Sequence, residues 1–326
     1  MKRFAFFSIV GLCFTLLFGF TLKPFSSSKL VNAAPVVPVT AILSEKVYND
    51  MFPQRDPFYT YTSFIRAIKE LSTIVVKVEK RDTYMFRITR TDKSTGKSTV
   101  VRQDADWNEA WAKKKLYTQF TVDFGAFCSE KTTETNKREL AAFLAQIAHE
   151  TRHGRNGQYD DGLMFLHEVN TSLPYVDPND VYPAVRGKKY YGRGPMQISY
   201  NGNYGFASDC IFGDKNKLLQ NPDLITSDAV TAFKTAVYFW MMPQELKPSA
   251  HNVMAGNWKP TAADVSKGRV AGFGMATNII NGEVECGRGN QFGPADRAGF
   301  YQAFLKKLNV TDPDCVCTCE KMQPYQ

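Results

Sequence analysis

The spacing of apolar residues along the chain predicts a protein that is mainly helical. Apolar positions recur at helical intervals over 44–52, where Ser44 is a suitable N-cap, and over 62–71. Most of the stretch from 136 to 310 shows helical patterns joined by loops rich in Gly and Asn. The pattern contains no internal repeat, so a helical globular domain is expected.

Residues 73–103 depart from this helical period. Apolar residues occupy alternate positions over 74–78 and again over 84–88, and Thr95-Gly96-Lys97 provides a turn before Val100. Alternation of this kind places apolar side chains on one face of a strand. The sequence therefore predicts a small antiparallel β-meander.

The clearest helical pattern covers 136–151, with an apolar stripe over 140–147. Asn136 is the expected N-cap, and Glu139 occupies the matching capping-box position. Glu150 continues the apolar stripe at the far end of the helix. A carboxyl group on a buried face tends to keep its proton, so Glu150 is a candidate general acid. The structural alternative is a glutamate at a frayed helix end that pairs with an arginine.

The first 33 residues have the pattern of a secretory signal peptide. Lys2 and Arg3 precede an apolar run over 4–20, and small residues follow up to an expected cleavage site after Ala33. An uncleaved membrane anchor is the alternative. The segment holds four basic residues and no acidic residue, so cleavage lowers the formal net charge from +8 to +4. A charge this modest does not favour a nucleic-acid partner.

The cysteine count supports export. Cys13 leaves with the signal segment, and an even number of cysteines in an exported chain favours disulfides. The sequence alone leaves their pairing open. The spacing of Cys315, Cys317 and Cys319 is too short for a usual zinc clip. The six cysteines that remain are Cys128, Cys210, Cys286, Cys315, Cys317 and Cys319.

Two chemistries compete for Glu150. The first is the H-E-x-x-H motif at 149–153, which on a helix places His149 and His153 on one face, ready for zinc, with the glutamate as general base. That zinc protease reading needs a third ligand, for which His167, Glu168 and His251 are the candidates. The metzincin extension of the motif is absent, and a five-residue match occurs readily by chance.

The second chemistry is a pair of carboxylates. Glu168 lies eighteen residues after Glu150, across a polar, loop-like stretch, so the two can face each other across a cleft as acid and base. The segment 190–199 then presents Gln197 and Ser199 on one face of an extended backbone, where they can bind a polar ligand or a water. A polar edge strand is the structural alternative for that segment.

Several motifs in this order resemble the family 19 glycoside hydrolases, the plant-type chitinases. The resemblance implies a mainly α, two-lobed, lysozyme-like domain with a substrate groove. We therefore expect a signal peptide at 1–33, a linker at 34–43, a catalytic domain at 44–310 and a Cys-rich tail at 311–326. The matching stretches are 138–151, 162–168, 190–199, 221–224, 233–243, 277–286 and 296–301.

The resemblance also implies roles for individual residues. Glu150 falls on the general acid, Glu168 on the general base and Ser199 on the residue that holds the attacking water, in an inverting mechanism. Members of the family bond the cysteine after N-G-x-x-E to one near the C-terminus, so Cys286 is expected to pair with Cys315. Positions expected to bind sugar, or to form a charged network beside the acid, are Gln197, Asn203, Gln244, Lys247, Asn281, Glu285 and Arg297.

Residues 73–130 form an insertion relative to the compact plant enzymes, and we favour a purely structural role for it. The resemblance implies a secreted, monomeric endo-chitinase that acts on chitin or chitooligosaccharides without metal or cofactor. The alternatives are a peptidoglycan hydrolase, a non-catalytic chitin-binding protein and, as the least favoured, the zinc metalloprotease.

Overall fold

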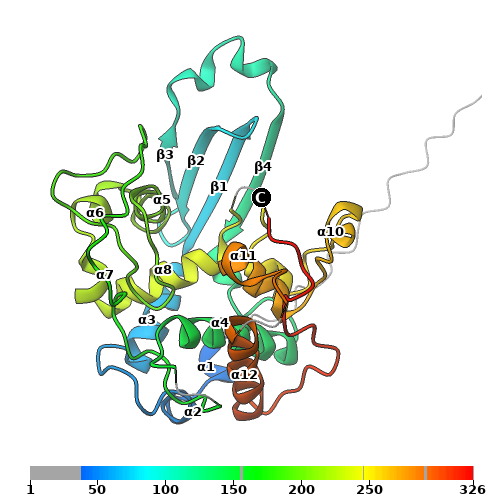
Figure 1. Ribbon diagram of the computed structural model, residues 1–326. Coiled ribbons are helices and arrows are strands. Elements are labelled where there is room, and N and C mark those ends of the chain that lie inside the picture. The colour runs from blue at the N-terminus through cyan, green and yellow to red at the C-terminus, as the bar shows by residue number, and fades with distance from the viewer. Residues whose placement is uncertain (1–37, 155–156, 245, 290–291, 326) are drawn as a thin grey trace, which may run out of the picture. The chain divides into compact units, whose positions relative to one another are not determined.

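Figure 1 shows the computed structural model, in which residues 38–154, 157–244, 246–289 and 292–325 are described. The expected signal peptide at 1–33, its cleavage site, and residues 34–37 of the expected linker lie outside the described residues. Among the helices of the described part, none is both long enough and apolar enough to cross a membrane.

The described chain is mainly helical and carries one small sheet, which confirms the predicted fold class (Figure 1). In chain order the strands are β1 (Ile74–Arg81), β2 (Met85–Asp92), β3 (Lys97–Gln103) and β4 (Tyr117–Asp123). The helices are α1 (Val39–Ile42), α2 (Glu45–Met51), α3 (Tyr61–Leu71), α4 (Thr133–Glu150), α5 (Asn201–Phe212), α6 (Asn216–Gln220), α7 (Leu224–Ser227), α8 (Ala229–Met241), α9 (Ala250–Met254), α10 (Ala262–Ser266), α11 (Phe273–Glu285) and α12 (Phe292–Lys307).

The starts of the early helices lie close to the predicted positions. Ser44 caps α2, where its hydroxyl accepts a hydrogen bond from the backbone of Val47 at 3.3 Å. Helix α3 begins at Tyr61 rather than at residue 62, because Thr60 is its cap. The expected linker is wrong over 39–42: these residues form α1, in which two side chains are buried.

The predicted start of α4 is also wrong. The helix begins at Thr133, and its N-cap is Thr132, whose hydroxyl accepts from the backbone of Thr135. Asn136 and Glu139 are fully buried instead, one turn inside the helix. The capping-box pattern was misleading because the two side chains bind other groups: Asn136 bonds the backbone of Lys131 just before the helix, and Glu139 binds Trp240 and His251.

The meander over 73–103 is confirmed, and a fourth strand joins it. All the strands pair antiparallel in the order β3-β2-β1-β4, so the two earliest strands lie at the centre (Figure 1). Strand β4 was missed because most of its side chains are exposed and it lacks an apolar alternation.

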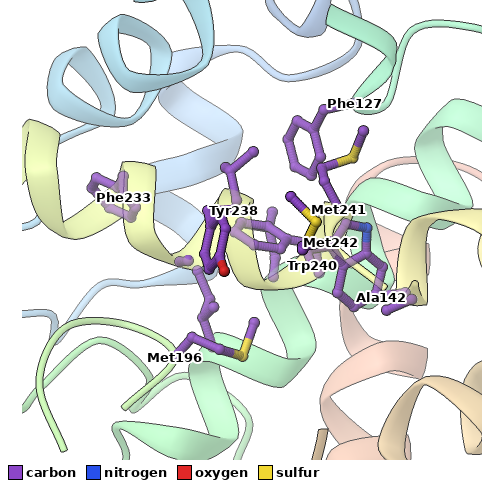
Figure 2. Close-up of a cluster of buried hydrophobic side chains, with 14 of the residues drawn as sticks. Phe127, Ala142, Met196, Phe233, Tyr238, Trp240, Met241 and Met242 are labelled. Carbon is purple, nitrogen blue, oxygen red and sulfur yellow. The ribbon is translucent and has the colours of Figure 1, made fainter. Parts of the chain in front are cut away.

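The core forms around helix α8, which lies between the sheet on one side and α4 and α12 on the other (Figure 1). Figure 2 shows Phe233, Tyr238 and Trp240 on α8, surrounded by Phe127 and Ala142 from other segments. Trp240 packs edge-on against Phe143 of α4 at 5.7 Å between ring centroids. Residues 139–148 of α4 are all fully buried, so burial fixes the second half of this helix in the core.

Candidate active site

Glu150 is the last residue of α4, and its side chain is 19% exposed. Its carboxylate Oε1 lies 2.6 Å from Nη2 of Arg297, whose side chain is only 1% exposed. Arg297 comes from α12, which packs along α4. The side-by-side packing of two helices thus brings a buried cation to the candidate acid, as the resemblance implied.

Arg297 also holds a second carboxylate. Its Nε and Nη2 donate to the two oxygens of Glu285 at 2.9 and 2.6 Å, and its Nη1 donates to Oε1 of Gln146 at 2.6 Å. Asn281 donates its amide to Glu285 at 2.7 Å. Glu285 and Arg297, the expected charged network, therefore lie together beside Glu150. Asn281, expected to bind sugar, and Gln146 are additional members of this network.

The pKa values in this network follow from the pairing. Burial opposes the charge of Arg297, but the charge of Glu150 and the hydrogen bonds to Glu285 outweigh it, so the pKa of Arg297 is raised. Burial likewise tends to raise the pKa of Glu285, but the hydrogen bond and the charge of Arg297 dominate and lower it from 4.5. Both groups are therefore held in their charged forms.

The H-E-x-x-H motif does not lie on one helix. Helix α4 ends at Glu150, so His153 lies beyond the helix and packs against the ring of Phe165 at 4.5 Å between centroids. His149 faces Asp296, with 2.7 Å from Nδ1 to Oδ2. The pattern requires both imidazoles on successive turns of a helix, and this chain lacks that arrangement.

Glu168 is carried by a segment without regular secondary structure. Upstream, Thr151 anchors the segment: its hydroxyl accepts from the backbone of Leu163 at 2.8 Å, and its carbonyl accepts from that of Met164 at 2.9 Å. Thr151 directly follows Glu150, so hydrogen bonds join the segments that carry the two candidate catalytic residues.

The carboxylate of Glu168 accepts two hydrogen bonds. The backbone N–H of Gly192 donates to Oε1 at 3.0 Å, and the Tyr175 hydroxyl donates to Oε2 at 2.9 Å. The hydrogen bond to this carboxylate raises the pKa of Tyr175, so its hydroxyl remains a donor. Tyr175 was not predicted, because it lies in a loop seven residues after Glu168 and no motif marks it.

Ser199 lies at the end of a tight turn over 192–199. The backbone groups of Arg193 and Ile198 bond each other in both directions, at 3.1 and 3.2 Å. The Ser199 hydroxyl donates to the carbonyl of Gln197 at 3.0 Å, and the Gln197 amide donates to that of Gly194 at 2.8 Å. This turn also carries the Gly192 N–H that binds Glu168, so it joins the candidate base and the candidate water-holding residue.

Three of the expected sugar-binding residues lie together at a cavity of about 480 Å³, which we call the sheet cavity. These are Asn203, Gln244 and Lys247. The backbones of Gln244 and Lys247 are hydrogen-bonded to each other in both directions. The full lining is Val78, Lys80, Phe86, Arg102, Phe120, Asn179, Tyr182, Ile198, Gly202, Asn203, Phe206, Tyr238, Phe239, Met242, Pro243, Gln244, Leu246, Lys247, Glu283 and Tyr325.

The expected bond between Cys286 and Cys315 is wrong. Cys286 pairs with Cys319, and Cys315 pairs with Cys317. The tail is nevertheless tied to the end of α11, as expected, but through a later cysteine. The sequence could not choose between tail cysteines two residues apart, because the path of the tail along α11 decides which sulfur reaches Cys286.

Glu139, Trp240 and His251 form a second buried polar cluster. It was not predicted, because Glu139 has the pattern of a capping residue. The carboxylate of Glu139 accepts from the Trp240 ring nitrogen at 3.0 Å and lies 2.7 Å from Nδ1 of His251. Burial tends to lower the pKa of His251, but the charge of Glu139 outweighs it and the pKa is raised. This cluster lies inside the core, where Glu139 is fully buried and His251 is 5% exposed.

Comparison with known proteins agrees with the fold. "Chitinase 3" of Oryza sativa subsp. japonica is 47% identical over 228 residues, which cover 67% of this chain and 70% of the rice protein. An "Endochitinase" of Persea americana is 50% identical over 192 residues, which cover 58% of each chain. The matched part of the chain thus spans 70% of the rice protein and 58% of the Persea americana protein.

Two solved structures are also similar. A class IV chitinase of family GH19 from Zea mays gives a TM-score of 0.54 at 26% identity, covering 87% of this chain and all of the maize chain. Chitinase C from Streptomyces griseus HUT6037 gives a TM-score of 0.57 at 28% identity, covering 85% of this chain and 80% of the Streptomyces chain. The mainly helical fold is therefore that of a family 19 glycoside hydrolase.

The family match makes the assignment specific. Residues 106–318 match the family described as chitinase class I. The chain belongs to this family of glycoside hydrolases. Strands β1 to β3 lie outside the matched residues, since β3 ends at Gln103.

Proposed function

We propose that the protein is an endo-chitinase that hydrolyses β-1,4 linkages between N-acetylglucosamine units with inversion of configuration. The proposal rests on the pair Glu150 and Glu168, whose segments are hydrogen-bonded to each other. Glu150 lies beside the buried Arg297, and Glu168 accepts hydrogen bonds from a backbone N–H and a tyrosine hydroxyl. Families of this class use two carboxyl groups on opposite sides of the scissile bond.

In the proposed reaction Glu150 donates a proton to the glycosidic oxygen as the bond to the sugar breaks. Glu168 takes a proton from a water that attacks the opposite face of the ring, and Ser199 orients that water. Gly192 and Tyr175 support the proposal because their hydrogen bonds hold the Glu168 carboxylate in one orientation.

The sugar chain binds along the expected groove positions. Gln197 and Asn281 belong to the segments that carry Ser199 and Glu285, while Asn203, Gln244 and Lys247 extend the site into the sheet cavity. Amide and ammonium groups of this kind suit the hydroxyl and acetamido groups of the substrate.

The stereochemistry of the product tests the mechanism. An inverting site gives the α-anomer first from a β-linked substrate, and a retaining site gives the β-anomer. NMR of products freshly released from chitohexaose, read before mutarotation, distinguishes the two. An initial β-anomer would mean that the pair does not act as proposed.

Substrate choice needs a separate experiment, because peptidoglycan is also a β-1,4-linked chain that contains N-acetylglucosamine. We expect colloidal chitin to be degraded and purified peptidoglycan to remain intact when both are incubated side by side. Release from peptidoglycan alone would favour the muramidase alternative, and binding of chitin without turnover would favour a non-catalytic protein. A parallel incubation with EDTA should leave the rate unchanged if no metal takes part.

We also propose that the enzyme is secreted and acts as a monomer. The signal pattern over 1–33 supports export. Amino-terminal sequencing of the protein recovered from culture medium should start at Ala34. A start at Met1 in a membrane fraction would favour the anchor alternative, and size-exclusion chromatography tests the monomer.

A further inference from the structure

The inserted sheet presents one face to the sheet cavity. Lys80 on β1 lies opposite Phe86 on β2, and Val78 lies opposite Phe120 on β4. All of these line the cavity, together with Arg102 of β3. Every strand of the sheet therefore contributes to one side of the cavity.

On the same face of the sheet, the side chains closer to the core are more deeply buried. Val76 and Ile88 on this face are fully buried, whereas Phe86 and Phe120 are only partly buried. The apolar face of the sheet thus continues from the core to the border of the sheet cavity. Partly buried aromatic side chains that border a cavity are a common feature of ligand sites.

Two cations lie over these rings. The Lys80 ammonium is 5.3 Å from the ring centre of Phe86 and 5.7 Å from that of Phe120. The Arg102 guanidinium is 4.5 Å from the Phe86 ring centre. Cation–π contacts hold both side chains at the cavity border. Nε and Nη2 of Arg102 also donate to Asp104 at 2.8 and 3.0 Å. The Lys80 ammonium carries three N–H donors, so it can bind more than one acceptor at a time.

The other side of the cavity belongs to the segments of the candidate active site. Ile198 directly precedes Ser199, and Glu283 lies on α11 two residues before Glu285. Among the described residues that line the cavity, neither Glu150 nor Glu168 occurs. The cavity therefore adjoins the proposed catalytic centre and does not include it.

The volume and the lining suit one part of a sugar chain. Pockets of roughly 300–1,000 Å³ hold small ligands, and the sheet cavity has about 480 Å³. Aromatic rings match the apolar faces of a pyranose, while ammonium and guanidinium groups donate to hydroxyl and acetamido oxygens. The lining has both kinds of group on the inserted sheet.

We propose that the inserted sheet forms a wall of the substrate groove, where Lys80 and Phe120 contact an N-acetylglucosamine unit some distance from the cleaved bond. This inference rests on the proposed function, and it replaces the purely structural role that the sequence favoured for residues 73–130. Strands β1 to β3 fall outside the family match, whereas β4 with Phe120 lies within it, so most of this wall is an addition to the part of the chain that the family shares.

The test measures binding without turnover, in protein that carries Glu150→Gln. Calorimetric titration with chitohexaose should show that Lys80→Met weakens binding about tenfold, because a charged hydrogen-bond donor is lost. Phe120→Leu should weaken binding about three- to tenfold, because the aromatic face is lost. Methionine keeps the apolar stem of Lys80, and leucine keeps an apolar side chain at the edge of the core.

Each variant has a matched control on the opposite face of the same strand. Lys77→Met removes an ammonium from β1, and Tyr117→Leu removes a ring from β4, and neither residue lines the cavity. Both controls should bind chitohexaose like the parent. Thermal unfolding of all four variants shows whether a loss of binding reflects a loss of folding. Where Phe120→Leu lowers the Tm, Phe120→Met takes its place, since methionine fills irregular space readily.

The outcomes separate the two proposals. If Lys80→Met and Phe120→Leu fold normally and bind chitohexaose as tightly as the controls, the sheet is not a groove wall, although the enzyme remains a chitinase. If the Glu150→Gln parent itself binds no chitohexaose and the unmodified protein cleaves none, the proposed function fails, and the wall fails with it.

Discussion

Glu150 ends an 18-residue helix and meets a buried arginine, whereas Glu168 lies in an irregular segment and meets a tyrosine hydroxyl and a backbone N–H. The first carboxylate belongs to a charged network shared by α4, α11 and α12. The second depends on hydrogen bonds within two loops. The difference suits the proposed roles, because an acid needs a fixed electrostatic setting and a base needs access to water.

The comparison also predicts which changes affect folding. The network around Glu150 is built into the helix packing, so changes there should alter stability as well as turnover. Tyr175, which binds Glu168, lies in a stretch over 171–180 in which no residue is buried. Loss of its hydroxyl should therefore alter turnover and leave the free energy of unfolding nearly unchanged.

The largest effect is expected for Glu150→Gln. The amide preserves the shape of the side chain but delivers no proton, and general acid catalysis contributes ~10²–10⁴-fold. The initial rate on chitohexaose should fall by that factor while chitohexaose still binds. Turnover at the parental rate would remove Glu150 from the mechanism.

Arg297→Met should affect folding strongly. It leaves the carboxylates of Glu150 and Glu285 without their shared cation, and loss of one partner of a buried ion pair costs about 3–5 kcal/mol. Urea unfolding measures this change. Tyr175→Phe is the matched change beside Glu168, and an equal loss of stability in both variants would contradict the contrast between the two regions.

Cys286→Ser should lower the free energy of unfolding of the protein by ~2–4 kcal/mol, because the disulfide between Cys286 and Cys319 closes a loop with a sequence separation of 33. The matched change is Cys315→Ser, whose bond to Cys317 spans a separation of only 2 and should matter much less. Unfolding by urea without reductant compares the two. A larger loss for Cys315→Ser would show that the tail is fixed differently.

Tyr175→Phe should lower the rate on chitohexaose by about two- to tenfold, because one hydrogen bond to the Glu168 carboxylate is lost. The unfolding midpoint in urea should stay within error of the parental value. A variant with full activity would show that Gly192 alone is enough to orient the carboxylate.

The smallest effect concerns acid pH. The pKa of Glu285 is lowered in the folded protein from 4.5, so its pairing with Arg297 stabilises the fold fully above that pH. The contribution is lost as the pH falls through the lowered pKa. Between pH 6 and pH 3 the Tm should therefore fall less steeply with decreasing pH for Glu285→Gln than for the parent. Equal slopes would mean that other carboxylates dominate acid unfolding.

The local sequence determined a good part of this protein. The cap at Ser44, the early helices and the meander over 73–103 follow from short-range patterns, because caps, turns and alternation act within a few residues. The motifs around Glu150, Glu168 and Ser199 were likewise visible in the sequence, since each lies in a continuous stretch that resembles one family.

Tertiary structure decided the rest, because it depends on residues far apart in the chain. Glu139 has the pattern of a capping residue, yet burial against Trp240 and His251 gives it a place inside the core. Whether Cys286 meets Cys315 or Cys319 depends on the path of the tail, which spacing does not fix. The position of the inserted sheet at the sheet cavity follows only from packing, since its strands pair with one another and their alternation does not specify what their outer face will meet.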